Sequence, residues 1–103
     1  MLGSYYGSTS PIPNSLNGYD SEVKSNLKTA AAAQESYFKD NGTYTNKIGS
    51  LKGFDQYSKV NITMEATTTT YVITGTATER CRPNTGTWSF NSITGAIDGT
   101  PCR

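Results

Sequence analysis

The sequence predicts an α+β domain in which one amphipathic helix packs on a small antiparallel sheet of three or four strands. Helical periodicity is confined to residues 20–40, whereas the alternation and β-branched composition typical of strands appear only after residue 57. A helix followed by a run of strands indicates α+β rather than alternating α/β architecture. A chain of 103 residues is expected to form one domain.

The predicted helix over residues 20–40 has apolar residues at the spacing of a single helical face. Asp20 is the expected N-cap, because its carboxylate accepts hydrogen bonds from unpaired N–H groups of the first turn. Lys39 suits the negative end of the helix dipole, and Asn41-Gly42 supplies a left-handed stop. The face consists of Val23, Leu27, Ala30, Ala31, Gln34, Tyr37 and Phe38.

We expect residues 1–19 to form an extended N-terminal arm ahead of a globular domain formed by residues 20–103. Pro11 and Pro13 fix φ and push the preceding residues into extended conformations, so this segment is not helical throughout. It is either a flexible leader or a strap onto the body or onto a second chain. The strap is the preferred interpretation because of the apolar and aromatic residues Leu2, Tyr5, Tyr6, Ile12, Leu16 and Tyr19.

After the helix, we expect residues 43–54 to form a connecting loop that Ile48, Leu51 and Phe54 anchor into the core. Strands are expected near 57–65, 68–78, 87–91 and 95–98. In the first of them, apolar residues alternate strictly, which is typical of a half-buried strand. Turns are expected at residues 65–67 and, from its Pro, Asn and Gly content, at residues 82–86.

The two cysteines, Cys81 and Cys102, are interpreted as a disulfide. With no further cysteine and no histidine, they lack the partners that a zinc site normally needs. A disulfide implies an oxidising compartment such as the periplasm or cell exterior. It would close a loop of about 20 residues, worth about 3 kcal/mol in the chain-entropy account. The alternative is a pair of free thiols in a reducing cytosol.

Several function classes are disfavoured by composition. A net charge of +1 with scattered basic residues provides no stripe for a nucleic-acid backbone. The absence of histidine removes Ser-His, Cys-His and His-metal sites. Ser21 and Lys24, like Ser25 and Lys28, have Ser-x-x-Lys spacing, but they fall on the polar helix face, where nothing would desolvate the lysine. The chain is therefore expected not to be an enzyme and to need no cofactor or metal.

Residues 26–44 resemble the second half of the long helix, and the loop after it, in type IV pilins and type II secretion pseudopilins. This resemblance implies the globular head of a filament subunit, with a helix laid on a small antiparallel sheet. Because many pilins close their C-terminal loop with a disulfide, it also supports the pairing of the two cysteines. The matching residues are Asn26, Leu27, Lys28, Ala33, Gln34, Glu35, Tyr37, Phe38, Asp40, Asn41, Gly42, Thr43 and Tyr44.

The chain departs from that family at its start. Pilins begin with a very apolar helical half, whereas residues 1–19 here are polar, and the sequence contains neither a signal peptide nor an apolar run of about 15 to 20 residues. Either the apolar half has been removed, or this is the globular chain of a split pilin whose apolar helix is a separate polypeptide.

The resemblance thus implies a structural subunit of a type IV pilus or pseudopilus, exported through the periplasm to an extracellular or cell-surface filament. Its expected partners are a short apolar pilin helix and copies of itself, with the inner membrane contacted only through the helix chain. The alternative is a soluble binding module of the minor-pilin or adhesin kind. The expected partner interface comprises Leu2, Tyr5, Tyr6, Ile12, Leu16, Tyr19, Ala32 and Ala33.

Overall fold

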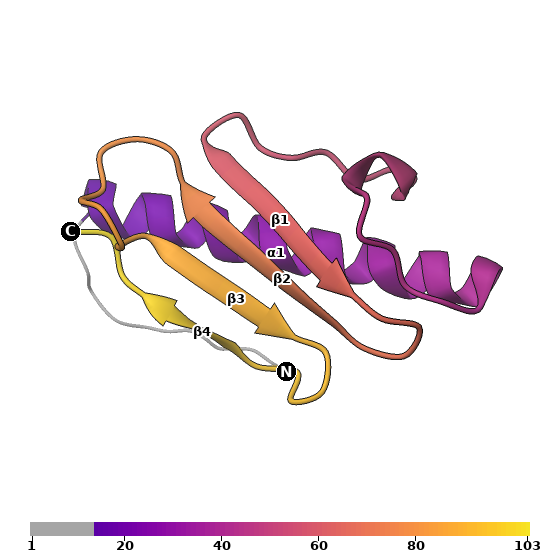
Figure 1. The fold of residues 1–103 in the computed structure, drawn as a ribbon. Helices are drawn as coiled ribbons and strands as arrows, with labels where there is room; N and C mark the ends of the chain where they lie inside the picture. Colours follow the sequence, from indigo (N-terminus) through magenta and orange to yellow (C-terminus); the bar gives the residue numbers. More distant parts are fainter. Residues whose placement is uncertain (1–13) are drawn as a thin grey trace.

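The computed structural model describes residues 14–103, with side chains from residue 18 onward, and shows one helix packed on a four-stranded antiparallel sheet (Figure 1). The predicted α+β class is therefore confirmed. The elements in chain order are α1 (Asn14–Asn41), the 3-10 turn η2 (Ile48–Ser50), β1 (Val60–Ala66), β2 (Tyr71–Ala77), β3 (Thr87–Asn91) and β4 (Ile97–Thr100).

Helix α1 begins at Asn14, six residues before the predicted start, so residues 14–19 of the expected arm are helical, and residues 1–13 lie outside the described part. Asp20 lies inside the helix and is not its N-cap. Gly18 lies inside the helix, although a glycine there costs about 1 kcal/mol relative to alanine. No proline follows residue 13 in this stretch, however, and Tyr19 and Asp20 pack against the body, so tertiary contacts outweigh the local preference.

The C-terminal end of α1 follows the predicted signal, one residue beyond the expected boundary. Gly42 has a φ of 75°, which glycine adopts without steric cost, and its N–H donates to the Phe38 carbonyl at 2.7 Å. The Asn41 side-chain amide also donates to the Tyr37 carbonyl at 3.0 Å. These two bonds satisfy carbonyls that the helix end would leave unpaired.

The strands form a meander in the order β1-β2-β3-β4, with every neighbouring pair antiparallel. Strand β1 starts three residues later than expected, and β4 covers residues 97–100 rather than 95–98. The first hairpin turn lies at residues 67–70 instead of 65–67. The Thr67 hydroxyl accepts hydrogen bonds from the Thr69 and Thr70 N–H groups there, which explains the displacement.

The core lies between α1 and one face of the sheet. Strand β1 alternates buried and exposed residues as the sequence predicts, with Val60 and Ile62 almost fully covered. The helix approaches the sheet closely at Gly75, where a Cβ atom would lie 2.9 Å from Val23 Cγ1. The helical residues of the core are Val23, Leu27, Ala30 and Ala31.

Two fully buried amides on the same helical face hold the loop that leads to the sheet. Asn26 donates to the Asp55 carbonyl at 3.0 Å and accepts from the Tyr57 N–H at 2.9 Å. Gln34 donates to the Thr45 carbonyl at 2.6 Å and accepts from the Thr45 N–H at 3.1 Å. These pairs satisfy the buried amides and fix the loop against α1.

Candidate interaction surfaces

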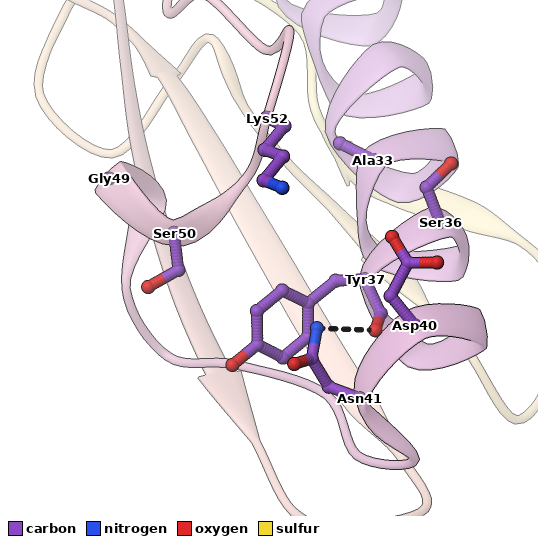
Figure 2. Close-up of a pocket in the computed structure, with 8 residues that line it drawn as sticks. All are labelled: Ala33, Ser36, Tyr37, Asp40, Asn41, Gly49, Ser50 and Lys52. Atoms are coloured by element: carbon purple, nitrogen blue, oxygen red, sulfur yellow. Dashed lines mark hydrogen bonds between the residues drawn. The ribbon is translucent and has the colours of Figure 1, made fainter.

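A groove of about 400 Å³ lies between the last turns of α1 and the segment around η2 (Figure 2). The helix contributes Tyr37 and Asp40, and Lys52 reaches in from the opposite wall. No ion pair joins Asp40 to Lys52 among the described residues. The groove therefore offers a carboxylate, an ammonium group and an aromatic ring, a mixture found in sites for polar ligands. The remaining lining residues are Ala33, Ser36, Asn41, Gly49 and Ser50.

A carboxylate and two tyrosines form a cluster near the C-terminal half of α1. Glu35 accepts hydrogen bonds from the Tyr71 hydroxyl at 3.1 Å and from the Tyr44 hydroxyl at 3.2 Å. Burial, followed by the nearby Glu35 charge, raises the pKa of both tyrosines above the ordinary value. The aromatic rings of Phe38, Tyr44 and Tyr71 pack in a row, with ring centroids 4.6 Å apart for Phe38 and Tyr44 and 4.7 Å apart for Tyr44 and Tyr71. The cluster joins the helix to the sheet.

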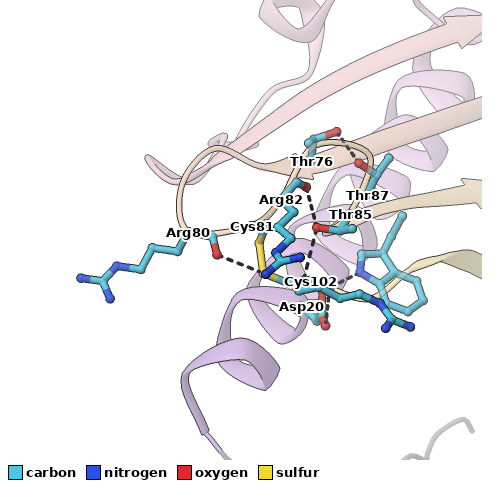
Figure 3. Close-up of a disulfide and its surroundings, with 10 residues drawn as sticks. Asp20, Thr76, Arg80, Cys81, Arg82, Thr85, Thr87 and Cys102 are labelled. Atoms are coloured by element: carbon cyan, nitrogen blue, oxygen red, sulfur yellow. Dashed lines mark hydrogen bonds between the residues drawn. A yellow bond between two sulfur atoms is a disulfide. The ribbon is translucent and has the colours of Figure 1, made fainter.

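At the other end of the sheet, a disulfide links Cys81 to Cys102 (Figure 3), as the sequence predicts. It joins the loop after β2 to the chain end after β4, two segments 21 residues apart. The backbone adds to this link, because the Arg82 N–H donates to the Arg103 carbonyl at 2.8 Å. The Arg80 side chain points away from the disulfide, so Arg80 does not form a basic patch over it (Figure 3).

Asp20 connects this disulfide corner to α1. Asp20 is only 8% exposed, and its carboxylate accepts from the Cys102 N–H at 3.0 and 3.1 Å and from the Trp88 indole N–H at 3.0 Å. Charge-assisted bonds of this kind are among the stronger ones in proteins. Asp20 was predicted to cap the helix, and this anchoring role could not be predicted, because nothing in the sequence near Asp20 points to partners 68 and 82 positions further along the chain.

Lys24, one turn after Asp20, places its ammonium 4.0 Å from the centroid of the Trp88 ring. This is within the range of a cation–π contact. Trp88 is thus held by a carboxylate at its N–H and a cation over its face. Both contacts orient the indole against the first half of α1.

The residues predicted for a partner interface are not brought together as one patch among those described. Tyr19 is half-buried against the core, Ala33 is half-buried in the groove, and Ala32 is exposed. Fourteen helical positions from Tyr19 to Ala33 correspond to about 21 Å along the axis. Leu16 lies in the first turns of α1, where its side chain is outside the described part. Leu2, Tyr5, Tyr6 and Ile12 fall outside the described residues.

The described residues form an α+β domain with two surface features, the groove and the disulfide corner. Within residues 14–103, no three His, Cys, Asp or Glu residues are grouped to hold a metal ion. No helix in that range has the length and apolar character needed to cross a membrane. No protein-family description matches the chain, and comparison with characterised proteins gives no match either.

Proposed function

We propose that this chain is a structural subunit of a type IV pilus or type II secretion pseudopilus, without catalytic activity. In this proposal it docks with a separate short apolar helix chain and with copies of itself. The assembly is a filament outside the cell, reached through the periplasm. The pilin-like pattern of residues 26–44, the helix-on-meander fold and the closed C-terminal loop support this together.

The observation that carries the proposal is the position of the first turns of α1, which lie beside the disulfide corner (Figure 1). A helix of 28 residues is about 42 Å long, while strands of seven residues span about 23 Å. Asp20 attaches α1 to the corner, and the six helical positions from Asn14 to Asp20 cover about 9 Å along the axis. In the proposal, an apolar helix from another chain meets the subunit at this end of α1, and load on it passes to the sheet through Asp20.

The test is reconstitution with short apolar helix chains encoded in the same genome, followed by size analysis in detergent and electron microscopy. The proposal expects a stable one-to-one complex that assembles into filaments. Tyr19→Ser should weaken the complex, because Tyr19 lies in the first turns of α1 and is only half-buried against the core, whereas Ile93→Ser should leave it unchanged. A chain that stays monomeric with every candidate helix would contradict the proposal.

The groove beside Tyr37 favours a second candidate, a soluble binding module of the minor-pilin or adhesin kind. Its Asp40 and Lys52 form no ion pair with each other, leaving both signs of charge for a ligand. This candidate expects binding to a surface or glycan that Tyr37→Ala and Asp40→Ala remove, with no filament formed. Ile93→Ser serves as the matched surface control.

A further inference from the structure

The groove between the last turns of α1 and the segment around η2 carries opposite charges on its two walls (Figure 2). Asp40 lies on the helix wall and Lys52 on the loop wall, and both residues are exposed. The one ion pair found among the described residues joins Lys59 to Glu79, neither of which lines the groove. The Asp40 carboxylate and the Lys52 ammonium are therefore both available to a ligand, and a ligand with one charge of each sign would match them.

The end of α1 strengthens the negative character of the helix wall. Asp40 is the penultimate residue of the helix, and the C-terminal end of a helix carries a partial negative charge. Lys39, the basic residue of that turn, is not among the residues that line the groove. An ammonium group beside Asp40 therefore meets two favourable partners, whereas a carboxylate fits the loop wall, where Lys52 and the Ser50 hydroxyl can donate to it.

Tyr37 provides an apolar surface in the same groove. Its ring extends from α1 towards the segment around η2, and the residue is half-buried (Figure 2). An aromatic face can cover aliphatic groups and also attracts a nearby cation. Ala33 and Gly49 add little bulk, and the volume of about 400 Å³ lies in the range of small-molecule sites. The groove thus combines an anion, a cation and an aromatic ring with room for a short aliphatic chain.

We propose that this groove binds ω-amino acids, in which a short aliphatic chain separates an ammonium group from a carboxylate. In the complex the ammonium pairs with Asp40, the carboxylate pairs with Lys52, and the methylene chain lies on the Tyr37 ring. The same chemistry occurs in free ω-amino acids and at the C-terminal lysine of a peptide. The proposal gives the binding-module candidate a ligand class, but it concerns the groove alone and is independent of filament assembly.

The exposure of the two charged residues sets the expected strength of binding. Exposed ion pairs contribute little because water and salt screen them, so we expect a dissociation constant of about 0.1–10 mM that rises with added salt. Asp40 and Lys52 form no ion pair with each other, so a ligand has to bridge them. A longer chain bridges better and covers more of Tyr37, so 6-aminohexanoate should bind at least about fivefold more tightly than glycine.

Titration of the full chain with 6-aminohexanoate, followed by NMR, tests the proposal. We expect saturable shifts of amides in residues 36–41 and 49–52, with roughly three- to tenfold weaker binding of hexylamine and of hexanoate, since each lacks one charge. A peptide that ends in lysine and the same peptide with an amidated C-terminus form a second arm. Tighter binding of the unmodified peptide than of 6-aminohexanoate would identify a protein C-terminus as the ligand, and the reverse order would identify a free ω-amino acid.

Exchange of the two charges gives a test by variants. Lys52→Glu makes both walls negative, so it should weaken 6-aminohexanoate binding at least about tenfold and favour the diamine cadaverine instead. Adding Asp40→Lys to Lys52→Glu restores opposite charges on the two walls and should recover binding of 6-aminohexanoate in the reversed orientation. Ile93→Ser, outside the groove, should bind as the unmodified chain does, and circular dichroism checks that all variants are folded.

Several results would overturn the proposal. Shifts that do not saturate, or that lie outside the groove, would show that the unmodified chain has no such site. Equal binding of hexylamine, hexanoate and 6-aminohexanoate would exclude recognition of both charges. Unchanged binding in the folded Lys52→Glu variant would exclude the loop wall. Tighter binding of a neutral oligosaccharide than of 6-aminohexanoate would assign the groove to glycans. None of these results would affect the pilus proposal, which filament assembly tests separately.

Discussion

Replacing Asp20 separates two interpretations of this residue, an N-cap and a buried anchor. In the structure the residue is 8% exposed, and its carboxylate accepts from the Cys102 N–H and the Trp88 indole N–H at 3.0 Å each. A hydrogen bond to a charged group contributes about 1.5–3 kcal/mol, and a partner left unsatisfied costs a similar amount. Because the two bonds share one carboxylate, we expect Asp20→Ala to lower the free energy of unfolding by about 2–4 kcal/mol.

Asp20→Ser is the decisive variant. Serine is a good N-cap residue, so the capping interpretation predicts a change of only a few tenths of a kcal/mol. The serine side chain is too short to accept hydrogen bonds from both Trp88 and Cys102. The structure therefore predicts that Asp20→Ser loses nearly as much free energy of unfolding as Asp20→Ala. Asp40→Ala, an exposed acid on the same helix, is the matched control and should stay within about 0.5 kcal/mol.

Urea unfolding followed by Trp88 fluorescence measures these differences, with circular dichroism as a second probe. For a domain of this size, a loss of about 3 kcal/mol corresponds to a fall in Tm of roughly 12–24 °C. Serine and alanine variants that both unfold within about 0.5 kcal/mol of the unmodified chain would refute the anchor. A serine variant that keeps full stability while alanine loses it would restore the capping interpretation.

Three further perturbations test the core, the disulfide and the tyrosine cluster. Gly75→Ala places a Cβ atom 2.9 Å from an α1 side chain, and overpacking should lower stability by about 1–3 kcal/mol in thermal unfolding; an unchanged Tm would contradict the close approach. The Cys81→Ser, Cys102→Ser double variant should lose about 3 kcal/mol in urea unfolding, and an unchanged midpoint would contradict that role. Tyr71 has a pKa raised above 10.0 by burial and by Glu35, so the folded state keeps its proton longer than the unfolded state. The contribution of this pKa difference to the free energy of unfolding is complete below pH 10 and is lost as the pH rises further. In urea unfolding measured at several pH values, the free energy of unfolding should therefore fall less steeply with pH in Tyr71→Phe than in the unmodified chain. Equal slopes in the two proteins would contradict the assignment.

The sequence predicted those features that depend on local periodicity and turn chemistry. The apolar face from Val23 to Ala31, the alternation of β1 and the stop at Gly42 each follow from neighbouring residues. The predicted start of α1 was wrong, because Asp20 has the local character of an N-cap, whereas in the structure Tyr19 and Asp20 lie inside the helix and pack against the body. The local signal gave no information on contacts that become available only after folding.

The candidate surfaces were less predictable for the same reason. The disulfide could be inferred from the count of cysteines, whereas the groove needs residues 33–41 and 49–52 to be placed opposite each other. Spacing along the helix could have separated Tyr19 from Ala33, since fourteen positions on one helix do not form one compact patch. The contacts of Trp88 with Asp20 and Lys24 have no sequence signal, because the two segments meet only across the folded sheet.

Polar residues on the apolar face of α1 explain how its position along the sheet is fixed. Leucine, valine and alanine contacts are not directional, so an apolar face by itself permits several axial placements on a pleated surface. Asp20, Asn26 and Gln34 each bond backbone groups of a different segment, and shifting the helix by one turn would leave all three without partners. Each unsatisfied buried group costs about 1–3 kcal/mol, so the three together disfavour a shifted helix far more than small changes in packing would. The apolar residues therefore hold the helix on the sheet, and the three polar residues select its position.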